Sequence, residues 1–277
     1  MTAANAAQDE FWNGRAGHTW AEYQVILDAQ LEPLGREAQR ALKPLPGERI
    51  LDVGCGAGQT SLALAEAVGP QGEVVGADLS GPLLKIARGR AAGLPVRFQL
   101  ADAQTSDFGG APFDAVYSRF GVMFFEGPAV AFANLKKALK PGGRLAFVCW
   151  RPFDENALMR LPLDAALPFI PPLAPSDPAA PGPFAFADPQ RVRAILTDAG
   201  FADVRVTPFD AMVGGGGVDE ALVLALRIGP LGAVLRENPD LAPVVAAAVR
   251  EALTARRGDD GRVLLPAAVW IVQATRS

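Results

Sequence analysis

The strongest constraint on the fold is a glycine-rich loop that joins an apolar strand pattern to a helical pattern. Residues 48–54 read ERILDVG, residues 59–68 read QTSLALAEAV, and the connection carries Gly54, Gly56 and Gly58. Glycine reaches positive φ and lacks a Cβ, so a ligand can approach the backbone closely there. The free N–H groups at the start of the following helix point toward the same place. The loop therefore predicts a nucleotide-type ligand site at the carboxyl end of the first strand.

Short β-branched runs alternate with longer helical patterns beyond this loop. The predicted strands are residues 48–54, 73–79, 96–102, 113–119, 144–150, 202–213 and 262–276, and the predicted helices include residues 59–68, 129–140 and 189–200. Such alternation is typical of βαβ units with a parallel sheet between helices. We therefore predict an α/β fold with a doubly wound, mostly parallel sheet and helices on both faces.

Composition limits the partners and the chemistry. The chain has 277 residues, half of them apolar, which suffices for one large core. A net charge of -4 provides no basic surface for a phosphate backbone, so no nucleic-acid partner is expected. Two cysteines without CxxC spacing and a single histidine predict no metal site. With neither a signal peptide nor a membrane span in the sequence, we expect a cytoplasmic protein.

The spacing of the glycines distinguishes between the possible types of nucleotide ligand. A dinucleotide fingerprint, GxGxxG, needs glycine at position 59, where this chain has Gln59, and residues 54–58 follow GxGxG instead. This pattern resembles the first motif of the class I S-adenosylmethionine (SAM)-dependent methyltransferases. The resemblance implies that the loop wraps the methionyl and ribose parts of SAM, with Asp52 near the methionyl ammonium. Asp78 follows at about the interval at which an acidic residue reaches ribose hydroxyls.

Further motifs in the same order strengthen the resemblance, which covers residues 48–150. By analogy with the family, the cofactor contacts beyond the loop are Leu79 on the adenine, Asp102 and Ala103 beside the adenine ring, and Ser118 and Arg119 beside the methionyl end. The segment LKPGGRLAF (139–147) matches the turn and strand typical of these enzymes. The resemblance also implies seven strands, the last antiparallel and inserted between the fifth and sixth, and S-adenosylhomocysteine (SAH) as the product.

Four segments are expected along the chain. Residues 12–23, WNGRAGHTWAEY, are similar to the lid of small-molecule methyltransferases related to quinone biosynthesis, so residues 1–47 are predicted to form a helical lid. Residues 48–150 form the SAM-binding core. Residues 151–188 are too rich in proline for a sheet and predict a helical substrate insertion. Residues 189–277 complete the sheet and contain a helical insertion at about 218–257.

The acceptor site is predicted from side chains beside the strand ends and in the lid. Its candidate residues are Trp12, Trp20, Tyr23, Phe120, Met123 and Trp150, for which ordinary packing is the alternative explanation. Methyl transfer needs alignment and exclusion of water more than a dedicated acid. His18 is the candidate general base, and an exposed histidine without a role is the alternative. We expect a small, apolar or aromatic acceptor with an O, N or C nucleophile, bound by a monomer or homodimer.

Two other functions stay open at this point. An NAD(P)-dependent oxidoreductase shares the fold and the acidic residue after the second strand, but the third glycine and a Tyr-x-x-x-Lys pair are missing. A noncatalytic SAM-binding protein would keep the loop without the transfer. Methyl transfer requires no unique catalytic side chain, so the motifs do not separate this second alternative from an enzyme.

Overall fold

The computed structural model describes residues 5–173 and 177–277, in which seven strands form one sheet. The strands are β1 (Arg49–Val53), β2 (Glu73–Asp78), β3 (Val96–Leu100), β4 (Phe113–Arg119), β5 (Leu139–Trp150), β6 (Phe201–Gly214) and β7 (Leu264–Arg276). Their order is β3-β2-β1-β4-β5-β7-β6, and β7 is antiparallel to both of its neighbours. The doubly wound, mostly parallel sheet with an inserted antiparallel last strand is therefore confirmed.

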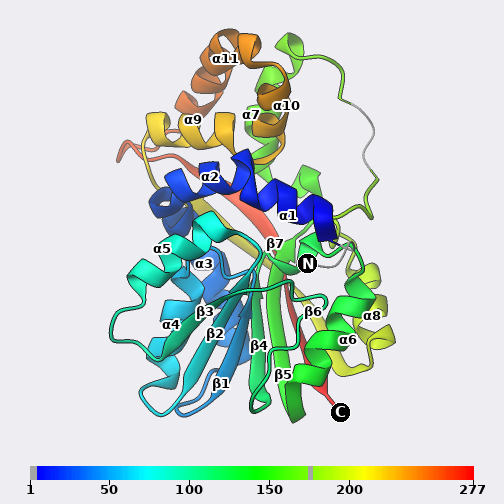
Figure 1. Ribbon diagram of the computed structural model, residues 1–277. Helices are drawn as coiled ribbons and strands as arrows, with labels where there is room; N and C mark the ends of the chain where they lie inside the picture. The colour runs from blue at the N-terminus through cyan, green and yellow to red at the C-terminus, as the bar shows by residue number, and fades with distance from the viewer. Residues whose placement is uncertain (1–4, 174–176) are drawn as a thin grey trace.

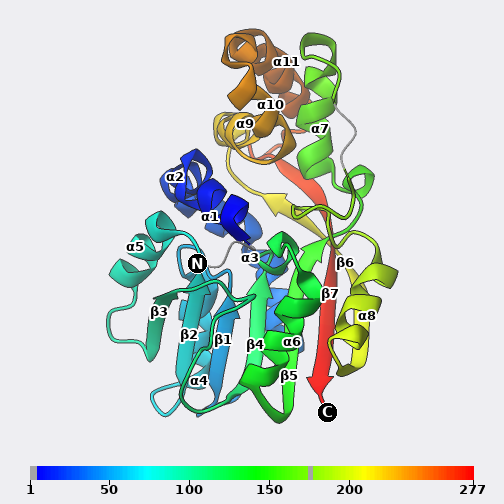
Figure 2. The same cartoon turned by 45° about the vertical axis from the view of Figure 1, so that its right-hand side comes forward.

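Helices cover both faces of this sheet. They are α1 (Ala6–Asn13), α2 (Arg15–Glu22), α3 (Gln24–Leu42), α4 (Gln59–Val68), α5 (Gly81–Arg90), α6 (Pro128–Ala138), α7 (Ala157–Ala166), α8 (Pro189–Asp198), α9 (Val218–Arg227), α10 (Gly229–Glu237) and α11 (Ala242–Thr254). In Figure 1, α1 and α2 cross above the carboxyl ends of the parallel strands, and α7, α9, α10 and α11 gather beyond them. Figure 2 shows α6 and α8 in front of the sheet and α3 behind it.

We call α1 and α2 the lid, and α7, α9, α10 and α11 the cap. The cap has an apolar core of its own, separate from that of the sheet, to which Leu163, Leu231 and Val249 contribute. Residues 174–176, which belong to the expected insertion at 151–188, lie outside the described residues. None of the described helices combines the length and the apolarity that a membrane span requires.

Two predicted boundaries differ from the structure. The predicted helix 129–140 ends at Ala138, and β5 begins at Leu139 instead of residue 144, because Leu139 already pairs with Phe113 of β4. The predicted helical stretch at about 218–257 consists of three helices. Gly229, at φ +75°, begins α10 two residues after the end of α9, and the segment Pro239–Leu241 separates α10 from α11. Glycine and proline break helices at such points.

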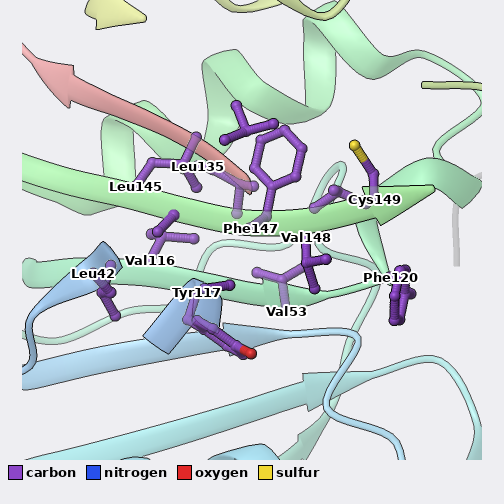
Figure 3. Close-up of a cluster of buried hydrophobic side chains, with 14 of the residues drawn as sticks. Leu42, Val53, Val116, Tyr117, Phe120, Leu135, Leu145, Phe147, Val148 and Cys149 are labelled. Atoms are coloured by element: carbon purple, nitrogen blue, oxygen red, sulfur yellow. The ribbon is translucent and has the colours of Figure 1, made fainter. Parts of the chain in front are cut away.

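The main core lies on both faces of the central strands. Figure 3 shows Phe147 on one side of the sheet and Tyr117 and Leu42 on the other, and all three side chains are buried. The Tyr117 hydroxyl donates to the backbone carbonyl of Gly35 in α3 at 2.8 Å. This bond satisfies a buried polar group, as burial requires. It also fixes α3 against β4, near the end of the strand that carries the site.

Asn156 attaches the cap to the sheet. Its side chain is fully buried, and its Oδ1 accepts from the backbone N–H of Ala268 in β7 at 2.8 Å. Its Nδ2 donates to the carbonyls of Arg151 and Pro152 at 3.2 and 3.1 Å. One amide therefore satisfies three backbone groups where the chain leaves the sheet to start α7.

We expect Asn156→Ala to lower the free energy of unfolding by about 2–4 kcal/mol, because it leaves buried backbone groups without partners. Urea denaturation followed by circular dichroism measures this loss. Asn238→Ala is the matched control, since Asn238 makes one local bond to the Val234 carbonyl, and it should cost less than about 1 kcal/mol. Equal losses in the two variants would contradict the anchoring role of Asn156.

Candidate functional site

A cavity of about 480 Å³ opens at the carboxyl ends of the parallel strands. The glycine loop and the ends of β2 and β4 form its floor, the lid forms one side, and α9 and α10 of the cap form the other. The strand order reverses between β1 and β4, which is where ligands bind in sheets of this kind. The volume lies within the range of small-molecule sites, roughly 300–1,000 Å³.

The three glycines of the loop have positive φ, of +67° at Gly54, +54° at Gly56 and +87° at Gly58. A Cβ on Gly54 would lie 2.7 Å from the Cα of Gly121, so the loops after β1 and β4 meet backbone to backbone. Gly54 and Gly56 line the cavity. Gly58 packs on the Phe98 ring instead, and it serves the turn rather than the wall.

Asp78 lies at the end of β2, beside the glycine loop. Its carboxylate accepts from the backbone N–H groups of Gly56 at 2.7 Å and Ser80 at 2.8 Å. Burial raises the pKa of Asp78 above its ordinary value, and these two bonds act against that rise. Asp78 and its neighbour Leu79 both line the cavity. A carboxylate has about four lone-pair sites, so acceptor capacity remains for a ligand with hydroxyl groups.

Asp102 stands on the adjacent wall and is bound to the N-terminal segment. Its Oδ1 accepts from Asn5 Nδ2 at 2.9 Å and from the backbone N–H of Gln104 at 2.8 Å. Asn5 Oδ1 in turn accepts from the N–H of Glu126 at 3.2 Å. Asn5, Asp102 and Ala103 line the cavity together. Asn5 cannot be identified from the sequence, since nothing in its local pattern connects it with a residue 97 positions away.

Asp52 occupies a different environment from the other two carboxylates. It is fully buried at the end of β1, and its Oδ2 accepts from the hydroxyls of Thr60 at 2.7 Å and Ser61 at 2.6 Å. Its Oδ1 has no hydrogen-bond partner among the described residues. Desolvation raises the pKa of Asp52 to about 6. Asp52 does not line the cavity, so the structure places it behind the glycine loop, where it braces the start of α4.

A polar network joins α3, the glycine loop, α5 and the end of β4. Asp28 of α3 pairs with Arg90 Nη1 at 2.9 Å and with Arg119 Nη2 at 3.3 Å. Arg119 also donates to the Gln59 side chain, and Gln59 Nε2 donates to the Asp28 carbonyl at 3.2 Å. One carboxylate thus faces two guanidinium groups, and Arg119 also interacts electrostatically with the buried Asp52.

This network borders a recess of about 70 Å³ beside the main cavity. Asp28, Arg119 and Gly56 are among its walls. Ser118, which precedes Arg119, does not line the recess or the cavity. Its hydroxyl donates to the Val53 carbonyl at 2.7 Å and so holds the ends of β1 and β4 together.

Asp28 was not predicted, although the sequence contains a signal for it. It lies next to Leu27 and three positions before Leu31, on the apolar stripe by which α3 packs on the sheet. A carboxylate on such a face requires a partner, because burial of an unpaired charge is costly. The partners themselves, 62 and 91 positions away, are visible only in the structure.

Five of the six residues predicted for the acceptor site line the cavity, namely Trp12, Trp20, Phe120, Met123 and Trp150. Trp12 meets Trp20 and Phe124 edge to face, at centroid distances of 5.7 and 5.2 Å. Phe120 stacks on Trp150 at 4.3 Å and has φ +60°, a conformation rare outside glycine. Such a residue is held by its surroundings, and it commonly marks a functional site.

Tyr23 and His18 lie elsewhere. Tyr23 is half-buried at the junction of α2 and α3 and is absent from the cavity wall. His18 is exposed on α2, whose neighbouring residues Thr19 and Trp20 face the cavity instead. The structure therefore does not bring the proposed general base to the site. One helical face holds Ala16 and Trp20, and position 18 falls on another.

The buried carboxylate of Asp52 predicts a pH dependence of stability. Its folded-state pKa of about 6 exceeds the ordinary aspartate value of 3.8, so stability falls as pH rises between these values and is lowest above pH 6. In Asp52→Asn the amide oxygen still accepts the Thr60 and Ser61 hydroxyls, but no charge forms. From pH 4 to pH 7 the variant should gain about 2–3 kcal/mol relative to the unmodified protein.

Chemical denaturation at several pH values measures this difference. Asp114→Asn is the control of opposite sign, because hydrogen bonds from Arg49 and Lys140 lower the pKa of Asp114 despite its partial burial. That control should lose stability relative to the unmodified protein as pH rises from about 3. A constant difference between Asp52→Asn and the unmodified protein across the range would contradict the burial effect.

Comparison with known proteins agrees with this geometry. A family profile described as "Methyltransferase domain" matches residues 50–143. A demethylmenaquinone methyltransferase of Thermus thermophilus is 37% identical over 188 residues, which are 64% of this chain and 84% of the relative. Nocamycin O-methyltransferase of Saccharothrix syringae is 35% identical over 62% of this chain and 66% of its own length.

The fold agrees with that of a solved methyltransferase. Phosphoethanolamine N-methyltransferase 2 of Haemonchus contortus, solved with SAM, superposes with a TM-score of 0.60 at 15% identity over 100% of this chain and 60% of its own. The nicotinamide-dependent alternative thus lacks support from the matched profile and these relatives. With the GxGxG loop, the partly buried Asp78 and the inserted antiparallel strand in place, this chain belongs to the class I SAM-dependent methyltransferases.

Proposed function

We propose that this protein binds SAM in the cavity and transfers its methyl group to an O, N or C nucleophile of a small apolar or aromatic acceptor. The observation that supports this proposal best is the arrangement of charged side chains around the glycine loop. Two carboxylates, Asp78 and Asp102, lie beside the loop and line the cavity, and the Arg119 guanidinium, held by Asp28, lines the adjoining recess. This arrangement suits a ligand with hydroxyl and amino groups at one end and a carboxylate at the other.

The residues present fit SAM part by part. Asp78 retains lone pairs for the ribose hydroxyls, and Leu79 and Leu83 provide apolar surface for the adenine. Asp102 and the Ala103 backbone lie where the adenine amino group and ring would be held. The recess beside Arg119 offers positive charge to the methionyl carboxylate. The glycine loop leaves room because Gly54 and Gly56 lack side chains.

The remaining walls suit a small acceptor. SAM supplies an activated methyl group that an in-line nucleophile displaces. The aromatic side chains of Trp12, Trp20, Phe124 and Trp150 exclude water and limit the orientations of a flat acceptor. His18 is exposed and lies outside the cavity wall, so the proposal assigns the transfer no histidine general base. Two relatives named for small molecules, demethylmenaquinone and nocamycin, support this class of acceptor.

The first test is cofactor binding by isothermal titration calorimetry. SAM and SAH should bind the unmodified protein, and Asp78→Asn should weaken both by about 10- to 100-fold, because it replaces an anionic acceptor for the ribose hydroxyls. Asp107→Asn, an exposed loop carboxylate, is the control and should bind normally. Binding of NAD in place of SAM would overturn the proposed function.

A second test separates the two ends of the cofactor site. Arg119→Gln should weaken SAH binding by about 10- to 100-fold, since a charge-assisted bond to the carboxylate is lost. It should leave the affinity for 5′-methylthioadenosine, which lacks the amino acid part, unchanged. Asp78→Asn should weaken both ligands.

Asp28→Asn should behave like Arg119→Gln but more mildly, because Asp28 acts by positioning the guanidinium of Arg119. Glu32→Gln, one turn further along α3 and exposed, is its control. Equal effects of Arg119→Gln on SAH and methylthioadenosine would contradict this assignment. Formation of SAH with a panel of small hydroxylated aromatic acceptors distinguishes an enzyme from a protein that only binds SAM.

A further inference from the structure

The cavity wall changes in charge from one end to the other. Among the described residues that form it, the ionisable side chains are Asp78, Asp102, Arg119, Arg227 and Arg236. The first three lie at the cofactor end, and each has hydrogen-bond partners in the core or in the N-terminal segment. Arg227 and Arg236 lie at the opposite end, on α9 and α10 of the cap. The rest of the wall is mostly apolar, with Thr19 and Gln30 among its polar members.

The two arginines of the cap lack carboxylate partners. None of the ion pairs among the described residues includes Arg227 or Arg236, or Arg15 of the lid. Arg236 donates one long bond, of 3.4 Å, to the Arg227 carbonyl. A guanidinium carries five N–H donors, so most of those on Arg236 are available to a ligand.

Arg236 is also a disfavoured cation in this position. It is half-buried, and its pKa is lowered, first by loss of solvent and then by the charge of Arg15, while Glu237 acts in the opposite direction. Glu237 is exposed and pairs with none of the described basic residues. Both cap arginines lie in the last turn of a helix, where the dipole favours a cation only slightly. The dipole explains neither the electrostatic interaction of Arg236 with Arg15 nor the place of both cap arginines in a cavity wall.

We propose that the acceptor carries a carboxylate and that Arg227 and Arg236 bind it at the cap end of the cavity. Guanidinium groups match a planar carboxylate with paired hydrogen bonds, and the half-buried position of Arg236 strengthens those that it makes. Leu224, Leu231 and Trp20 provide the surface for the apolar body of the acceptor. Arg15 adds positive charge from the lid. This inference rests on the proposed function and specifies the acceptor class for it.

The carboxylate orients the acceptor, and a different functional group of the acceptor receives the methyl group. The cap arginines lie on α9 and α10, whereas the glycine loop lies at the strand ends, with the lid between them (Figure 1). An acceptor held by its carboxylate at the cap therefore directs its opposite end to the cofactor. The nucleophile is then a hydroxyl, amine or carbon remote from the carboxylate.

Binding of a matched pair of probes tests the inference. The pair is 6-hydroxy-2-naphthoate and 6-hydroxy-2-naphthamide, which differ in charge but hardly in shape, titrated into the protein saturated with SAH and followed by probe fluorescence. The acid should bind at least about 10-fold more tightly than the amide. In the double variant R227Q/R236Q the acid should lose about 10- to 100-fold in affinity, and the amide should be unaffected.

Two controls keep the outcomes distinct. Arg256→Gln, an exposed arginine just after α11 that does not line the cavity, should leave both probes unaffected. SAH affinity should be the same in all variants, which shows that the cofactor site and the fold are intact. If the unmodified protein fails to bind SAH, the proposed function fails, whatever the probes do.

Several results would overturn the carboxylate assignment while the proposed function stands. One is equal affinity of the acid and the amide, or undetectable binding of the acid, in a protein that binds SAH. Another is an equal loss for both probes in the double variant. A third is tighter binding of 2-naphthyl phosphate than of the naphthoate, which would assign the arginines to a phosphorylated ligand instead.

Discussion

One buried carboxylate, Asp28, connects the parts of the molecule that a ligand must meet together. It lies on α3, pairs with Arg90 of α5 and Arg119 of β4, and its backbone carbonyl receives the amide of Gln59 at the start of α4. A buried carboxylate is tolerated in a protein interior only with partners, and the two guanidinium groups supply them. Arg119 keeps N–H donors for an anionic ligand group beside the glycine loop, and the same contacts hold α3 against the ends of the strands.

Parts of the site that depend on local geometry were predictable from the sequence. A turn from a buried strand into a helix needs positive φ, so the positions of Gly54 and Gly56 predicted the turn beside the cavity. The length of the second strand then predicted that Asp78 lies at the edge of the same cavity. Parts that depend on contacts between distant segments were not predictable. Asn5 reaches Asp102, and Arg236 enters the wall, only because α1 and α10 fold over the strand ends, and no local period encodes those approaches.

Two residues that were predicted for the site, His18 and Asp52, lie elsewhere in the structure for the same reason. His18 was selected for its chemistry alone, and the helical face on which it falls turns it to solvent. Asp52 was expected near the ligand because it precedes the glycines. The strand places its side chain on the hydroxyls of α4 instead, where desolvation rather than a ligand determines its pKa. In both cases the residue type suggested chemistry, and the direction of the side chain decided the environment.

The last residues of β6 and β7 extend past the sheet as a two-stranded arm. β5 pairs with β7 only as far as Trp150 with Val269, whereas β6 and β7 continue to pair until Gly214 meets Leu264. Three helices of the cap, α9, α10 and α11, are inserted there between β6 and β7. The cap has its own apolar core, and the family profile ends at residue 143, before any part of it. Because of this arm, the two halves of the cavity can change independently of each other. The half that recognises the cofactor can remain constant while insertions at the end of the arm are exchanged, so that related chains acquire new acceptors without rebuilding the sheet.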